Sequence, residues 1–158
     1  VKDLGDLNGK AVATTQGTTS DKYIKMGAKG EQVKVTNVYG KDHSDSFAMV
    51  ASGRAAAFVM DDNILAGLIA KSSKPKDFKI VGPVLSSEPY GIMLPKGDAA
   101  YKAIADKVVT GMWKNGQMAA LYKKWFQSPI PPKNINLNMP MSTSYNKLKA
   151  APNDKGIN

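Results

Sequence analysis

Three short polar stretches in this sequence carry side chains that could bind a small charged molecule. Residues 16–21 (QGTTSD) hold a glycine and three hydroxyl groups, and residues 40–47 (GKDHSDSF) hold His43, the one histidine. Residues 59–63 (VMDDN) hold two neighbouring aspartates. Hydroxyl, backbone N–H and imidazole groups suit a carboxylate, and a carboxylate side chain suits an ammonium group. The three stretches together predict a site for a polar small molecule.

The candidate ligand-binding residues are Gly17, Thr18, Thr19, Ser20, His43 and Asp61. Each of these residues also has an ordinary structural explanation. A hydroxyl can cap a helix, a turn histidine can face solvent, and Asp61 with Asp62 can be first-turn acids favoured by the helix dipole. The binding interpretation therefore depends on the three stretches meeting in space.

The elements around these stretches alternate between strand and helix patterns. Short apolar or β-branched runs predict strands at residues 11–15, 33–39, 56–60 and 78–81. Helical spacing predicts helices at residues 18–28, 44–52 and 61–71. This order predicts an α/β fold with a mainly parallel sheet covered by helices on both faces. In such sheets ligands bind at the carboxyl ends of the strands, where the three polar stretches fall.

The second part of the sequence has a different pattern. Residues 90–94 predict a strand, and two amphipathic helices follow, with apolar stripes over 101–113 and 118–126 separated by Gly116. The stripes are wide enough to need a partner surface. From residue 129 the chain is rich in proline and asparagine, which predicts an extended tail with one helical turn near 145–149.

Composition excludes several classes of protein. There is no cysteine, so neither disulfides nor thiolate metal sites can form, and no cofactor is expected. One histidine and no Gly-x-Ser-x-Gly elbow leave no constellation for nucleophilic catalysis, and residues 16–21 lack the glycine and lysine spacing of a phosphate loop. Asp61 and Asp62 would point about 100° apart at a helix start, unlike a hydrolase pair. An enzyme is not expected.

The formal net charge of +9 raises nucleic-acid binding as a competing interpretation. The excess lies mainly in the second half as single lysines, and Arg54 is the only arginine, whereas base and phosphate recognition relies on arginine. A solvated lysine-rich face is the simpler explanation, and no nucleic-acid partner is expected.

Several separated motifs resemble one family. The segments DLNGKAVATTQGTTSD, AFVMDD, EPYGIMLPKGD and MAALYKKWF are similar, in order and spacing, to the second half of family 3 solute-binding proteins, the periplasmic receptors of amino-acid ABC importers. KDHSDSFAMVASGRAAAFVMDD, KWFQSPIPPKN and PNDKGIN resemble the glutamate/aspartate-binding branch. The resemblance implies a periplasmic-binding-protein-like type II fold, with one complete lobe and part of the other.

The resemblance also implies boundaries and roles. Lobe two would span residues 1–86, the hinge 87–90, the carboxy-terminal part of lobe one 91–128, and the tail 129–158. Asp61 would pair with the ligand ammonium, the turn of residues 17–20 would meet the ligand with hydroxyl and amide groups, and His43 would approach a side-chain carboxylate. The implied partners are L-glutamate or L-aspartate and a membrane permease in a Gram-negative periplasm. Another polar amino acid, such as glutamine, remains an alternative ligand.

The family's α-carboxylate clamp, an arginine with hydroxyls from the first part of lobe one, has no counterpart here, and Arg54 does not match it. We therefore expect this chain to bind an amino acid weakly or undetectably. We also expect the striped helices of residues 98–126 to expose an apolar patch, and homo-oligomers or segment exchange to follow.

Overall fold

The computed structural model describes residues 1–26, 33–131 and 133–155. The chain divides into two compact units, Val1–Ser87 and Glu88–Asn158. Within the described residues, no helix combines the length and the apolar character needed to cross a membrane. The assignment of the units to lobes, a hinge and a tail stays a prediction.

The first unit is built on three parallel strands, β1 (Ala11–Thr15), β2 (Thr36–Gly40) and β3 (Ala57–Phe58). Their order is β2-β1-β3, so β1 is the central strand. Thr15 pairs with Gly40, and Ala13 pairs with Phe58. Because all three strands run the same way, their carboxyl ends lie at one edge of the sheet. The expected α/β fold with a parallel sheet is confirmed.

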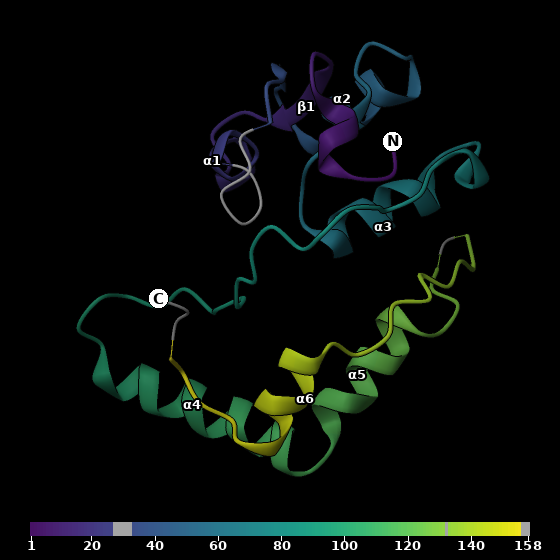
Figure 1. The fold of residues 1–158 in the computed structure, drawn as a ribbon. Helices are drawn as coiled ribbons and strands as arrows, with labels where there is room; N and C mark the ends of the chain where they lie inside the picture. The colour runs from purple at the N-terminus through teal and green to yellow at the C-terminus, as the bar shows by residue number, and fades with distance from the viewer. Residues whose placement is uncertain (27–32, 132, 156–158) are drawn as a thin grey trace. The chain divides into compact units, whose positions relative to one another are not determined.

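Helices cover both faces of β1 because its side chains alternate between them. Val12 packs on one face with the short 3-10 helix η1 (Leu4–Leu7) and with α1 (Thr19–Met26). Ala13 packs on the other face with Met49 of α2 (His43–Ala51). The unit also contains α3 (Asp62–Lys71) and η3 (Pro75–Asp77), and Figure 1 shows β1 among the labelled helices of this unit.

One of the strands expected in the first unit does not form. Residues 78–81 are not a strand, and the expected helix over 18–28 has its last two residues outside the described part of the chain. A strand needs a neighbour for its ladder of hydrogen bonds, and β-propensity supplies none. Phe78 instead packs its ring against Phe47 of α2, with centroids 4.8 Å apart.

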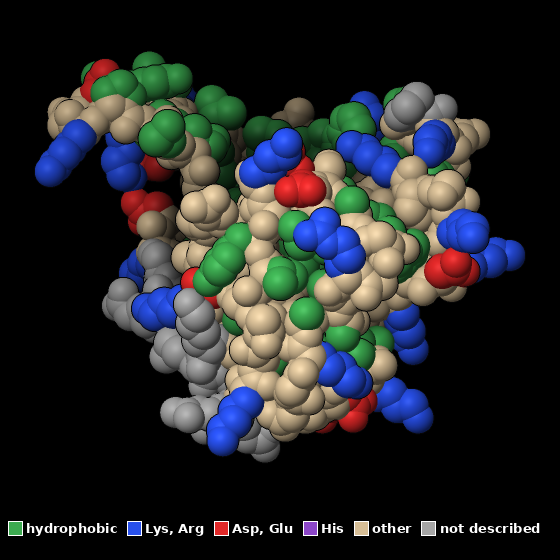
Figure 2. All heavy atoms as spheres, turned by 90° about the horizontal axis from the view of Figure 1, so that it is seen from above, with side chains coloured by type: hydrophobic (Ala, Val, Ile, Leu, Met, Phe, Trp, Pro, Cys, Tyr) green, Lys and Arg blue, Asp and Glu red, His purple; other side chains and the backbone are tan. Residues whose placement is uncertain are grey.

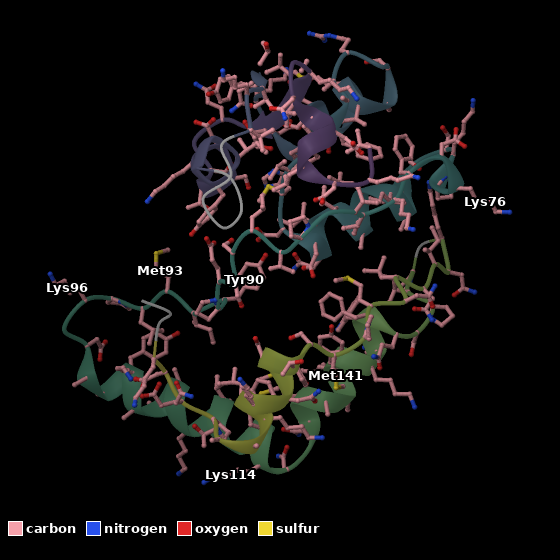
Figure 3. All side chains as sticks on the ribbon, viewed as in Figure 1. Lys76, Tyr90, Met93, Lys96, Lys114 and Met141 are labelled. Carbon is pink, nitrogen blue, oxygen red and sulfur yellow. The ribbon has the colours of Figure 1, made fainter. Side chains whose placement is uncertain are left out.

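The second unit consists of α4 (Ala99–Lys114), α5 (Gln117–Phe126) and α6 (Thr143–Ala150). Gly116 lies between α4 and α5 with φ 83°, a left-handed conformation that suits glycine. The expected strand at 90–94 is wrong, because these residues join no ladder. Met93 is 95% exposed on this segment, where Figure 3 labels it before α4.

Aromatic rings join the three helices of the second unit. Tyr145 of α6 lies 5.0 Å from Trp113 and 4.7 Å from Tyr122, measured between ring centroids. Tyr122 also packs against Phe126 at 4.7 Å. Burial raises the pKa of the Tyr145 hydroxyl. The tail is therefore less extended than expected, because α6 runs for eight residues where one turn was predicted, and its apolar face has ring partners.

Candidate functional site

Three helices begin at the carboxyl edge of the parallel sheet, and each start carries a predicted site residue. Thr19 is the first residue of α1, His43 is the first of α2, and Asp61 occupies the N-cap position of α3. Helix N-termini direct backbone N–H groups and the positive end of the dipole outward. The edge therefore combines backbone N–H groups of three helix starts with acidic side chains, a combination that suits a ligand with both charges.

The turn after β1 is built around Gly17, whose φ of 77° is left-handed. The Thr18 hydroxyl donates to the Thr15 carbonyl at 2.8 Å, which closes the turn locally. Thr19 is exposed, whereas Ser20 is buried with its hydroxyl 3.9 Å from the Met60 sulfur. Of these three residues, Thr19 is thus the exposed one, and the hydroxyls of the other two have partners within the protein.

The Ser20 contact also joins two of the polar turns. Met60 immediately precedes Asp61, so the start of α1 lies against the turn that leads into α3. Asp61 is half-buried, and its carboxylate does not cap α3. The alternative given for Asp61, an acid favoured by the helix dipole, needs no such bond and is consistent with this position. Asp62 is exposed and accepts from the backbone N–H of Asn63 at 2.7 Å.

At the start of α2, two aspartates have structural roles that His43 does not share. The Asp42 carboxylate caps the helix by accepting from the Asp45 N–H at 2.8 Å, and the Asp45 carboxylate accepts from the Lys41 N–H at 3.2 Å. These reciprocal bonds satisfy backbone donors at the helix start. His43 is not used in this way, because its half-buried ring points to β1, where Nδ1 lies 2.8 Å from the Thr15 hydroxyl.

Two buried hydroxyls behind His43 escaped the sequence analysis. Thr15, the last residue of β1, lies 3.0 Å from the Ser46 hydroxyl of α2. Gly40, opposite Thr15 in the sheet, makes room for this contact, since a Cβ there would be 2.5 Å from the Ser46 nitrogen. The signal in the sequence was a threonine ending an apolar run beside a glycine turn, but the 31-residue separation from Ser46 is visible only in the fold.

A second polar network lies beside the same strand ends. The Thr14 hydroxyl donates to the Asn37 side chain at 2.9 Å, and the Asn37 amide in turn donates to Asp21. The Tyr39 hydroxyl donates to Asp21 at 3.0 Å. These bonds tie the first turn of α1 to β1 and β2, so they hold the Gly17–Thr19 turn in place.

The second unit offers a hollow of a different kind. It has a volume of about 350 Å³ and is lined by Met112, Gln117, Ala120, Leu121 and Lys124 of α4 and α5. Its lining is mainly apolar, and it contains none of the predicted site residues. Among the described residues, no group of three or more His, Cys, Asp or Glu side chains could hold a metal ion.

Comparison with known proteins gives close relatives over the full chain. This chain is 47% identical over 155 residues to the L-glutamate/L-aspartate-binding protein of Pseudomonas aeruginosa. The aligned region covers 98% of this chain and 51% of the relative. The chain is 43% identical over 158 residues to the glutamate/aspartate import solute-binding protein of Salmonella typhimurium, covering 100% of this chain and 52% of the relative.

Among solved structures, an ancestral arginine-binding protein bound to arginine matches with a TM-score of 0.66 and 34% identity, covering 80% of this chain and 54% of that one. No protein-family model matches the chain. The match of sequence and fold confirms the similarity indicated by the separated motifs. Over its whole length the chain is therefore similar to solute-binding proteins named for glutamate and aspartate, and it spans about half of their length.

Proposed function

We propose that this chain supplies one side of a binding site for an acidic amino acid, L-glutamate or L-aspartate, in the receptor of an ABC importer. The observation that carries the proposal is the meeting of Thr19, His43 and Asp61 at one sheet edge, in a chain 47% identical to an L-glutamate/L-aspartate-binding protein. The receptor would work in the periplasm and pass its ligand to a membrane permease.

Each residue has a chemical role in this proposal. Asp61 would pair with the ligand ammonium, since an ammonium removed from water needs an opposite charge. The turn of Gly17, Thr18 and Thr19 would donate N–H and hydroxyl groups to one carboxylate at the positive end of α1. His43 would approach the second carboxylate at the start of α2. Ser20 is a weaker candidate, because it is buried against Met60.

Nucleic-acid binding gains no support from the distribution of charge. On the face seen in Figure 2, Lys and Arg side chains lie scattered rather than gathered in one basic patch. Salt-sensitive binding to duplex DNA needs several cations that can follow the phosphates together. Titration of the chain with a DNA duplex at low salt is therefore expected to give no binding.

Chemical-shift titration with glutamate, aspartate and glutamine tests the proposed ligand. At millimolar concentrations the acidic ligands should shift the amide signals of Thr19, His43 and Asp61, and glutamine should shift those of His43 least. The Asp62→Asn variant is a matched control, because the Asp62 carboxylate is exposed and accepts from the next residue's N–H. The proposal fails if Asp61→Asn and Asp62→Asn weaken glutamate binding equally, or if neither acidic ligand shifts these signals.

A chimera provides a more sensitive test of the same proposal. The relatives are about twice as long as this chain, so the remaining part of the Pseudomonas aeruginosa protein can be fused before residue 1. Calorimetry should then detect glutamate binding that the chain alone shows weakly or not at all. Micromolar affinity in the isolated chain would contradict the expectation that half of the site is insufficient.

A further inference from the structure

A short chain of hydroxyl groups connects the interior of the first unit to the ring of His43. Ser46 is fully buried and Thr15 is 5% exposed. The Thr15 hydroxyl lies 3.0 Å from the Ser46 hydroxyl and 2.8 Å from Nδ1 of His43. Each hydroxyl has one proton to donate, so the direction of one bond in this chain determines the next.

The contacts of Ser46 determine the direction of the hydrogen bonds in this chain. The Ser46 oxygen lies 3.0 Å from the Asp42 carbonyl, one helical turn back, and 3.2 Å from the Thr14 carbonyl. Carbonyl oxygens only accept, and the Ser46 hydroxyl has donor geometry to both, so we assign its single proton to one of them. If Ser46 donated to Thr15 instead, its oxygen would face two carbonyl oxygens at 3.0 and 3.2 Å with no proton between them, and their lone-pair repulsion disfavours that arrangement.

The other two bonds follow from this one. Because the Ser46 proton is used, the contact with Thr15 is a hydrogen bond only if Thr15 donates to Ser46. The Thr15 oxygen is then left to accept, and its remaining partner is Nδ1 of His43. Nδ1 must therefore carry a proton. The opposite arrangement, with Thr15 donating to Nδ1, leaves the Thr15 and Ser46 oxygens 3.0 Å apart with no proton between them.

We propose that Thr15 and Ser46 are positioning residues that fix the proton of neutral His43 on Nδ1. In the neutral ring Nε2 is then an acceptor, and it becomes a donor only when the ring takes up a second proton. This step rests on the proposed function. It gives His43 the role of selecting ligands that carry a second carboxylate. A ligand carboxylate at Nε2 requires the charged ring, so binding of glutamate or aspartate takes up one proton from solvent.

Charged side chains flank His43 at the start of α2. On its own segment, the neighbours are the carboxylates of Asp42 and Asp45, which cap the helix start, and Lys41, which precedes them. From the strands, the uncharged Thr15 contacts the ring, and Thr15 is paired in the sheet with Gly40. This segment therefore carries two carboxylates and one ammonium beside the ring in sequence.

The position of the proton can be measured without any ligand. His43 is the one histidine, so nitrogen-15 labelling of histidine gives ring signals that need no assignment. In two-bond proton–nitrogen spectra at pH 8, Nδ1 should show the shift of a protonated nitrogen and Nε2 that of an unprotonated one. The reverse pattern in the unaltered chain overturns the proposal, whatever the chain binds.

Variants distinguish the effect of the Thr15 and Ser46 hydroxyls on the ring from general effects on the fold. Thr15→Val keeps the shape but removes the acceptor, so the ring should change to the form protonated on Nε2, and Thr15→Ser should restore the Nδ1 form. Ser46→Ala frees the Thr15 proton for the ring and should produce a mixture. Thr18→Val is the matched control, since that hydroxyl bonds the Thr15 carbonyl and not the ring. An unchanged ring in Thr15→Val overturns the proposal.

Ligand titration at two pH values completes the test. Because binding of an acidic ligand takes up one proton in this proposal, glutamate affinity should fall between pH 5.5 and pH 8 by up to about tenfold per pH unit, and glutamine affinity should not. If the neutral ring carries its proton on Nδ1 and glutamate fails to bind, the roles of Thr15 and Ser46 are supported and the proposed function fails. If glutamate binds equally at pH 5.5 and pH 8, the proton uptake is refuted while the proposed ligand is supported.

Discussion

The two compact units use their apolar side chains differently. In Val1–Ser87, Val12, Ala13 and Ile24 are fully buried, and a parallel sheet holds the core. In α4, α5 and α6 of Glu88–Asn158, no described side chain is fully buried, although the helices are strongly patterned. Tyr101, Ile104 and Val108 remain 50–61% exposed along α4. One unit therefore contains its own core, and the other presents a stripe that needs a partner surface.

This difference bears on stability as well as on binding. A core that is complete within one unit can support cooperative unfolding of that unit. Helices without buried side chains gain little from packing and depend on propensity and local contacts. The predicted site residues Thr19, His43 and Asp61 all belong to the first unit. We expect the first unit to remain folded under conditions in which the second is already loosened.

The largest expected effect is that of Gly40→Ala. The added Cβ would lie 2.5 Å from the nitrogen and 2.9 Å from the Cα of Ser46, so α2 must move away from the sheet. Overpacking against backbone should lower the free energy of unfolding of the first unit by about 3 kcal/mol. Urea unfolding followed by the His43 resonance measures it. Gly67→Ala, with nothing within 4 Å of the added Cβ, is the control and should not destabilise the chain.

A smaller effect should distinguish matched valines in the two units. Val12→Ala removes two methyl groups from a fully buried position and should cost about 2 kcal/mol, whereas Val108→Ala, 54% exposed on α4, should change stability by less than about 0.5 kcal/mol. Both tryptophans, Trp113 and Trp125, lie in the second unit, so their fluorescence follows that unit. Equal losses for both variants would refute the comparison.

The exposed stripe should make the chain self-associate as its concentration rises. Contiguous exposed apolar surface drives association, and α4 alone presents three large side chains on one face. Ile104→Glu should reduce the mass measured by light scattering at high concentration. Lys107→Glu makes a larger change in charge on the same helix but spares the stripe, so it should have less effect. A monomer at every concentration would contradict this expectation.

The smallest expected effect concerns the contact between α4 and the end of the described chain. Lys102 lies 2.5 Å from Asp106 and 2.7 Å from Asp154, and hydrogen bonds to these carboxylates raise its pKa. The bond from Lys102 lowers the pKa of Asp154 below its usual 3.8. The contact should therefore be present above about pH 4 and be lost as the pH falls through the lowered value. Backbone signals near Asp154 should sharpen in acid but not in Lys102→Ala, where they are already sharp.

The sequence predicts elements well where local pattern and tertiary partner agree. β1 begins and ends as expected, and α2, α3, α4 and α5 lie within a residue or two of their predicted bounds. Residues 78–81 and 90–94 have strand-like sequences, but a strand also depends on a neighbour that no local pattern contains. The same limit explains why α6 was underestimated, since its Tyr145 packs on rings from two other helices.

The candidate site, too, could be predicted from the sequence only in part. Thr19, His43 and Asp61 could be selected because each follows a predicted strand, and parallel strands bring such residues to one edge. Their binding roles stay predictions. Thr15 and Ser46 could not be selected, because their importance arises from a contact between β1 and α2 at a distance of 3.0 Å. Hydrogen-bond direction is a property of the assembled fold, so it is absent from any local motif.

The strand order also determines when the site can assemble during synthesis. The central strand is made first and pairs with residues 36–40 and then 57–58, so its contacts span increasing separations in sequence. Long-range parallel pairing is slow, but here every partner precedes the second unit. A chain emerging from the ribosome can close the sheet and join the three helix starts before α4 has been translated. The exposed stripe is then translated after the first unit has been able to fold, which limits misfolding between the two.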